Sequence, residues 1–253
     1  MPELIRNIAG YLERHPQLAT SVSLESAQTD GVGGTRLLDL MAEEKYRRVL
    51  SRMLDESEFL SPYGIRSISR YHQEHPYIFS AGGQEFGVQY APAESDSGMF
   101  GGNSNWRGPI WMPINVLLIR SLLNLYQYYG DDFRVECPTR SGKLMNLFEV
   151  SKEIAERLTR IFLRDEHGRR PVYGGTEKFQ SDPHWRDHIL FYEYFHGDND
   201  AGFSASHQTG WTGLVAKLIE VYGLLDPKQI LEVGAVAAIA EKSRTTGLPN
   251  SGQ

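Results

Sequence analysis

Cysteine is almost absent from this sequence, since Cys137 is the single one among 253 residues. One thiol excludes an internal disulfide and any cysteine-rich metal site. We therefore expect Cys137 to be buried and unreactive.

Long apolar runs and clusters of basic residues are missing as well. No stretch approaches the roughly 18 consecutive apolar residues of a transmembrane helix, and charges scattered through the amino-terminal residues argue against a signal peptide there. We therefore expect a soluble, cytoplasmic protein. The 26 Lys and Arg residues are dispersed and are outnumbered by 32 Asp and Glu, which gives a net charge of −6. This pattern argues against nucleic acid and membranes as partners.

Cofactor motifs are missing too. The sequence has no G-x-S-x-G, no P-loop and no dinucleotide fingerprint, so we expect no cofactor. His184 and His188 lie four residues apart on a predicted helix, a spacing that could hold zinc. The glutamate of H-E-x-x-H is missing and no third ligand is marked, so a structural or sugar-contacting role for these histidines is favoured over a metal site.

Most of the chain shows the periodicity of helices. Apolar residues at helical spacing predict helices over residues 2–14, 36–54, 114–129, 147–162, 183–195, 211–222 and 227–241. Residues 61–102 lack this period, and two short runs that flank Ala81-Gly82-Gly83 predict a small β-hairpin. No βαβ alternation occurs, which favours an all-α fold of about seven helices joined by alternately short and long loops. Residues 242–253 are predicted to be a frayed tail.

The sequence NSNWRGPIWMPIN, from Asn103 to Asn115, precedes the most regular of these helices. Pro113 should lie in the first turn of that helix, after a rigid non-helical lead-in. Tryptophan faces beside a guanidinium and side-chain amides suit a sugar ring, whose C–H faces stack and whose hydroxyls form hydrogen bonds. The alternative is a buried loop whose Trp and Arg side chains pack and cap the helix.

Two further loops combine aromatic and acidic residues. One is Val172 to Asp187, which contains Glu177 and Trp185; the other is Phe191 to Val215, in which Glu193 stands among aromatic residues. A carboxylate among aromatic rings is partly desolvated, which favours its acting as a proton acceptor. Glu193 is therefore the first candidate for a catalytic base, and the alternative is a glutamate at a helix end that points to solvent.

These motifs occur in an order that resembles glycoside hydrolase family 63. Trp106-Arg107-Gly108-Pro109-Ile110-Trp111 is followed by a helix, then by Glu193, and then by Thr209-Gly210-Trp211-Thr212. The resemblance covers residues 41–219, and the combination is specific although each piece alone is weak. The family includes processing α-glucosidases of the mannosyl-oligosaccharide type and mannosylglycerate-hydrolase-like enzymes.

The resemblance implies an (α/α)6 barrel and inverting hydrolysis of an α-glycosidic bond, in an oligosaccharide or a small glycoside such as an α-glucoside or α-mannoside. Such chemistry uses two carboxyl groups, an acid and a base, roughly 6.5–9.5 Å apart. It implies that Glu193 is the general base. The predicted substrate-binding residues are Trp106, Arg107, Trp111, Asp96, Glu177, Trp185, His207 and Gln208.

The sequence departs from the family pattern where the general acid should be. The family places an aspartate in a glycine-containing loop well before WRGPIW, and residues 1–102 contain no such loop. Twelve helices would need roughly 150 residues before any loops, and only about seven are visible. We therefore expect residues 1–253 to be the carboxy-terminal portion of a longer glycosidase domain, an incomplete ring that exposes apolar surface and self-associates.

Two questions follow from the missing acid. Asp96 and Glu94 are the carboxylates nearest to WRGPIW, and we predict that Asp96 supports its loop or holds a sugar hydroxyl, without donating a proton. The second function to consider is a non-catalytic carbohydrate-binding or structural helical domain.

Overall fold

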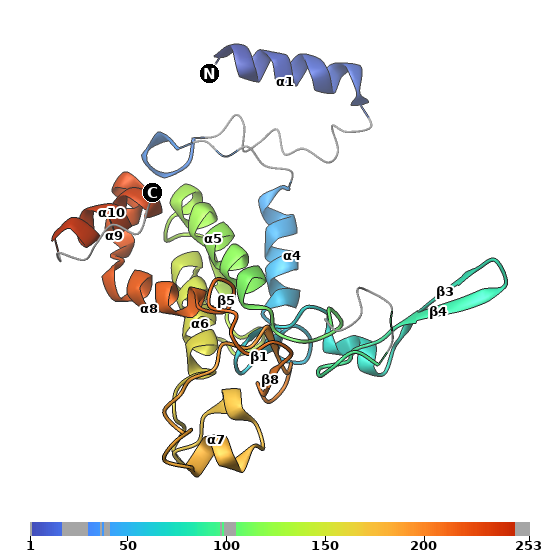
Figure 1. Ribbon diagram of the computed structural model, residues 1–253. Coiled ribbons are helices and arrows are strands. Elements are labelled where there is room, and N and C mark those ends of the chain that lie inside the picture. The colour runs from blue at the N-terminus through green and yellow to red at the C-terminus, as the bar shows by residue number, and fades with distance from the viewer. Residues whose placement is uncertain are drawn as a thin grey trace.

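The computed structural model describes residues 2–16, 30–35, 37, 41–96, 98 and 105–245. This part of the chain is mostly helical (Figure 1). Its α-helices are α1 (Pro2–Arg14), α4 (Glu43–Met53), α5 (Met112–Tyr129), α6 (Leu147–Arg160), α7 (Glu177–Ser181), α8 (Leu214–Leu224), α9 (Pro227–Val233) and α10 (Ala235–Thr245). The predicted helical character is confirmed.

Small two-stranded sheets accompany the helices, and each of those described is an antiparallel hairpin. The pairs are β1 (Leu60–Ser61) with β2 (Gly64–Ile65), β3 (Tyr77–Ala81) with β4 (Gln84–Val88), β5 (Arg134–Glu136) with β6 (Leu144–Asn146), and β7 (Tyr194–Phe195) with β8 (Gly202–Phe203). The pair β3–β4 confirms the hairpin predicted around Gly82 and Gly83 and projects away from the helices (Figure 1).

Helix α5 forms as the sequence predicts. Trp111 has an extended backbone at the N-cap, and Pro113 lies in the first turn, where its missing N–H costs nothing. Gly130 ends the helix with a φ of 68°, a conformation that glycine adopts without steric strain.

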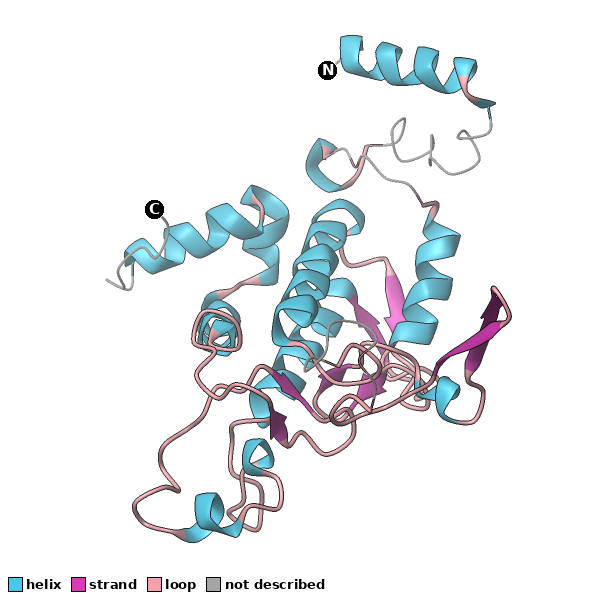
Figure 2. Ribbon diagram, turned by 45° about the vertical axis from the view of Figure 1, so that its right-hand side comes forward, coloured by secondary structure: helices cyan, strands magenta, loops and turns pink. Residues whose placement is uncertain are grey.

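The core lies where α5 packs along α6 and both contact α8 (Figures 1 and 2). Helix α6 begins with a capping box, in which Asn146 and Glu149 each accept the other's backbone N–H at 2.9 and 2.8 Å. Its inner face contributes fully buried residues such as Ile154 and Leu158. Helices α9 and α10 pack on each other and contact α5, while β1 and β8 lie at the opposite end, below α4 and α5 in Figure 1.

The helix predicted over residues 183–195 is wrong. Asp182 accepts the backbone N–H of His184 at 2.8 Å, a local turn that competes with helix formation. Residues 194 and 195 instead form β7, which pairs with β8. His184 and His188 therefore do not share a helix face, and the i, i+4 spacing that could have held zinc is lost.

Other boundaries differ in smaller ways. The last predicted helix is two helices, α9 and α10, which Gly234 separates with a φ of 83°. Helix α10 runs to Thr245 and so includes residues 242–245 of the predicted tail, while residues 246–253 lie outside the described part of the chain. Residues 36 and 38–40 of the second predicted helix also lie outside it; the described helix there begins at Glu43.

Cys137 is buried and free, as predicted. Burial raises the pKa of its thiol to about 11, so the reactive thiolate is scarce near neutral pH. Within the described ranges, no helix combines the length and the apolar character that crossing a bilayer demands.

Candidate functional site

Three segments that are distant in the sequence meet at β7. Ile110 and Phe195 exchange two backbone hydrogen bonds, of 2.8 and 3.0 Å. Strand β7 also pairs with β8, so that Tyr194 lies opposite Phe203. The WRGPIW segment and residues 202–203 therefore lie on the two sides of the strand that follows Glu193.

Four aromatic rings from these segments form a pile, which we call the tryptophan stack: Trp106, Trp111, Tyr194 and Phe203. The centroids of Trp106 and Trp111 are 3.8 Å apart with planes 2° from parallel, Trp111 to Tyr194 is 5.0 Å, and Tyr194 to Phe203 is 6.0 Å. Trp111 is only 2% exposed, whereas Trp106 is 39% exposed. Trp106 is thus a partly open aromatic surface on a rigid base, which suits stacking of a sugar ring.

Glu193 is half-buried next to this stack, and its neighbours hold both its backbone and its side chain. Its carboxylate Oε2 accepts a hydrogen bond of 2.6 Å from Ser204 Oγ. Its backbone carbonyl accepts a bond of 3.1 Å from Trp211 Nε1, and Thr212 donates to the carbonyl of Tyr192. The TGWT turn therefore fixes the backbone that carries the carboxylate.

The hydroxyl of Tyr194 lies in the electric field of two carboxylates. Burial raises the pKa of Tyr194, and the negative charges of Glu94 and Glu193 raise it further. The Tyr194 phenol therefore stays protonated near neutral pH.

The WRGPIW segment also braces that loop. Arg107 is 5% exposed, and its Nη2 donates to Asp96 Oδ1 at 2.5 Å and to Ser95 Oγ at 3.2 Å. Asn105 Nδ2 donates to the carbonyls of Ala91 and Ala93. The hydrogen bond and charge of Arg107 lower the pKa of Asp96. An ionised Asp96 is a poor proton donor at neutral pH, which fits the loop-supporting role predicted for it.

Glu177 and Trp185 belong to a different place, which we call the α7 segment, residues 174–188. Helix α7 lies apart from the other helices, at the bottom of Figure 1. Glu177 forms an exposed ion pair of 3.0 Å with Arg169, which lowers the pKa of Glu177. Trp185 packs on Phe179 at 5.6 Å. No interaction between described residues joins these two side chains to the tryptophan stack.

His207 and Gln208 adjoin the strand that leads to Glu193. His207 is exposed and lies opposite Phe191 in a β-bridge, with its Nδ1 3.1 Å from Ser206 Oγ. The N–H of Gln208 donates to the carbonyl of Phe191 at 2.8 Å. The structure therefore brings Trp106, Trp111, Glu193, His207 and Gln208 to one part of the molecule, and Arg107 next to Trp106 binds Asp96.

Some residues of the site escaped the sequence reasoning. Tyr194 was seen only as part of an aromatic surrounding, and its place within the stack depends on pairing with Ile110 and Phe203. Ser204 gave no signal, because nothing in the sequence indicates that its hydroxyl reaches Glu193. In the described part of the chain, no three His, Cys, Asp or Glu side chains form a cluster suited to a metal ion.

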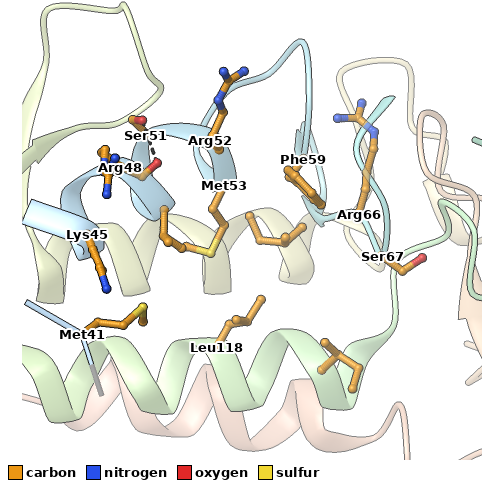
Figure 3. A pocket seen from close by; sticks show the side chains of 13 residues that line it. Met41, Lys45, Arg48, Ser51, Arg52, Met53, Phe59, Arg66, Ser67 and Leu118 are labelled. Carbon is orange, nitrogen blue, oxygen red and sulfur yellow. Dashed lines mark hydrogen bonds between the residues drawn. The ribbon is translucent and has the colours of Figure 1, made fainter. Parts of the chain in front are cut away.

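A pocket of 870 Å³ lies elsewhere, between α4 and α5 (Figure 3). Met53 of α4 and Leu118 of α5 face each other across it. Its lining has an apolar floor with cationic residues and contains no carboxylate: Met41, Lys45, Arg48, Val49, Ser51, Arg52, Met53, Phe59, Ile65, Arg66, Ser67, Ile114 and Leu118. Without an acid or a base, this pocket is not a candidate for two-carboxylate chemistry.

Comparison with known proteins agrees with the motifs. Residues 34–212 match the model of the mannosylglycerate hydrolase MGH1-like glycoside hydrolase domain. The chain is 48% identical over 232 residues to uncharacterized protein YMR196W of Saccharomyces cerevisiae. It is 28% identical over 171 residues to the probable mannosyl-oligosaccharide glucosidase of Schizosaccharomyces pombe, and 22% identical over 177 residues to the mannosyl-oligosaccharide glucosidase of S. cerevisiae.

Each alignment covers most of this chain but only a small part of the relative. The three alignments cover 88%, 68% and 69% of this chain, in the order given above. They cover 21%, 15% and 15% of the relatives, so the chain spans about a fifth of the first relative's length and less of the other two. The resemblance to family 63 glycoside hydrolases is confirmed for this stretch.

Proposed function

Because this chain belongs to the mannosylglycerate hydrolase MGH1-like glycoside hydrolase family, we propose that it carries the general base and a sugar subsite of an inverting α-glycosidase. The observation that carries the proposal is the position of Glu193, whose backbone is fixed by Trp211 beside a half-open tryptophan stack. The substrate class is an α-glucoside or α-mannoside.

In the proposed reaction, a sugar ring packs against Trp106 and the Glu193 carboxylate faces a water molecule. Glu193 takes a proton from that water as the oxygen attacks the anomeric carbon, on the face opposite to the leaving group. A second carboxyl group protonates the leaving oxygen, so the bond breaks with inversion. His207 and Gln208, beside the strand that leads to Glu193, are proposed to contact sugar hydroxyls.

The second carboxyl group is proposed to come from outside this chain. Asp96 is engaged by Arg107 and has a lowered pKa, which disfavours it as the acid. The relatives are several times longer than the matched region, which leaves room for an aspartate loop in a preceding segment. In this proposal residues 1–253 are the carboxy-terminal portion of an (α/α)6 barrel. A cytoplasmic location is part of the same proposal.

We propose that the missing helices of the ring pack against α4 and α5, beside the pocket between these two helices. Val49, Ile114 and Leu117 are 50%, 39% and 58% exposed on these two helices. Apolar surface of this kind, next to an open pocket, favours association. We propose that the isolated chain self-associates through this face and that a complete ring covers it.

The alternative is a carbohydrate-binding domain without catalysis, and the engagement of Asp96 by Arg107 is the observation that favours it. One experiment separates the two functions. The chain, alone and in a longer protein that supplies an amino-terminal segment with a glycine-flanked aspartate, is incubated with α-glucosides and α-mannosides while NMR follows the anomeric protons. The proposal predicts initial release of the β-anomer by the longer protein. Binding without release supports the alternative, and initial release of the α-anomer contradicts inversion.

A further inference from the structure

Ser204 has an unusual backbone for its position at the end of β8. Its φ is 66°, in the left-handed region that residues other than glycine, asparagine and aspartate rarely adopt. The left-handed conformation gives a serine residue no energetic advantage of its own. An observed outlier of this kind, next to a candidate catalytic group, points to a functional reason for it.

The hairpin register explains why the outlier matters. Tyr194 lies opposite Phe203 across β7 and β8, so Glu193 and Ser204 are the next pair outward. Side chains of successive strand residues point to opposite faces. The rings of Tyr194 and Phe203 stack on one face, and the next pair therefore belongs to the other face.

The contact within this outward pair is short and directional. Ser204 Oγ lies 2.6 Å from Glu193 Oε2, and an O–H donor to an ionised carboxylate characteristically gives a bond of this length. Ser204, with its left-handed backbone, directly follows β8, and its hydroxyl contacts the residue that directly precedes β7.

We propose that Ser204 is a positioning residue for Glu193: its hydroxyl donates to Oε2 and fixes the plane of the carboxylate that takes the proton from water. The proposal rests on the proposed function, because it assigns Ser204 a task within that reaction. The hydrogen bond between Ser204 and Glu193 exists whether or not the chain hydrolyses a glycoside.

Three substitutions separate the hydroxyl from the backbone. Ser204→Gly keeps the left-handed backbone without strain and removes the donor. Ser204→Asn keeps both, since asparagine adopts this conformation and carries an amide N–H. Ser206→Ala is the control, because Ser206 Oγ contacts His207 and not Glu193.

The first measurement needs no catalysis. The chain is labelled with ¹³C in its glutamate carboxyl groups, and NMR records the Glu193 signal at pH 7, with Glu193→Gln identifying the signal. Loss of the hydrogen bond from Ser204 should change the chemical shift of this carboxyl signal in Ser204→Gly. The chemical shift should stay near that of the parent chain in Ser204→Asn and in Ser206→Ala. An unchanged signal in Ser204→Gly would overturn the proposal.

The second measurement uses the longer, active protein. Ser204→Gly should lower kcat by about tenfold with little change in KM. Ser204→Asn should restore most of the activity. Equal kcat for parent and Ser204→Gly would contradict the positioning role. If the parent releases no sugar while the Glu193 carboxyl signal still changes in Ser204→Gly, the proposed function fails and the contact between Ser204 and Glu193 stands.

Discussion

The tryptophan stack and the α7 segment have similar residue types, but different interactions hold the two regions in place. Each place combines tryptophan with glutamate: Trp106 and Trp111 of the stack lie beside Glu193 in one case, and Glu177 and Trp185 share one segment in the other. The first region is tied to the core by backbone bonds between Ile110 and Phe195. The second is held by an exposed ion pair, by side-chain hydrogen bonds of Tyr173 and Gln180 to nearby backbone, and by packing of Phe179. Residue types alone therefore do not mark a site; long-range pairing that fixes them does.

The largest expected difference between the two regions concerns their glutamates. In the longer, active protein, Glu193→Gln should lower kcat by about 10³-fold, because a positioned general base contributes roughly 10² to 10⁴. Glu177→Gln loses only an exposed contact to Arg169 and should lower kcat by less than about threefold. Initial-rate kinetics on both variants makes the test, and a comparable loss in the two would break the distinction.

The tryptophans should differ in stability. Trp111 is 2% exposed, so Trp111→Ala opens a cavity and should cost about 3–5 kcal/mol in the free energy of unfolding. Trp185 is 41% exposed, so Trp185→Ala should cost at most about 1 kcal/mol. Urea unfolding followed by circular dichroism measures both. A small effect of Trp111→Ala would mean that the stack is not a rigid base.

A smaller effect comes from Asp200, in the turn between β7 and β8. Its carboxylate is fully buried, and neither oxygen has a hydrogen-bond partner among the described residues. Burial raises the pKa of Asp200 well above its ordinary value of 3.8; the nearby Arg66 opposes this and Asp198 adds to it. Above pH 3.8 the unfolded state has lost a proton that the native state keeps, so stability falls as the pH rises toward the folded pKa.

Asp200→Asn should remove this dependence. Asparagine tolerates the φ of 59° at this position, and the variant should be more stable at pH 7 by roughly 1–3 kcal/mol. Its advantage should shrink as the pH approaches 4. Asp198→Asn, two residues away, loses an ion pair of 3.0 Å with Arg66 and should destabilise instead. Thermal unfolding across this pH range measures both variants, and an Asp200→Asn chain no more stable than its parent at pH 7 would refute the account of this carboxyl group.

The smallest expected effect concerns Asp96. Asp96→Asn removes the charge that faces the buried Arg107 and loosens the loop that precedes WRGPIW, so sugar binding should weaken by about three- to tenfold while some hydrolysis persists. Asp187→Asn breaks the exposed pair with Arg164 in the α7 segment and should leave binding unchanged. Isothermal titration with an α-glucoside or α-mannoside compares the two. Complete loss of hydrolysis in Asp96→Asn would assign the acid to Asp96.

Local signals predicted the helices well. The apolar face of α5 ends at Gly130, and α6 starts at a capping box, so both could be read from neighbouring residues. The helix expected over residues 183–195 failed because its carboxy-terminal end forms a strand with residues 202–203, and local periodicity does not contain that pairing. The break at Gly234 was visible as a glycine but was outweighed by the apolar pattern on both sides.

Only those site residues that belong to recognisable sequence motifs could be predicted. Trp106, Trp111 and Glu193 were found because their order resembles a known family. The separate location of Glu177 and Trp185 could not be found in this way, because they belong to a segment of similar composition. The hydroxyl of Ser204 depends on the register of β7 and β8 and on one left-handed residue, neither of which the sequence states.

The most direct test of the account uses the four tryptophans themselves, since each has one indole N–H. In a ¹H–¹⁵N NMR titration of the chain with an α-glucoside or α-mannoside, single Trp→Phe variants assign the four indole signals. The account predicts that the signal of Trp106 shifts most, that those of Trp111 and Trp211 follow, and that the signal of Trp185 does not move. A shift of Trp185 with no change in Trp106 would place the sugar on the α7 segment and contradict the proposed site.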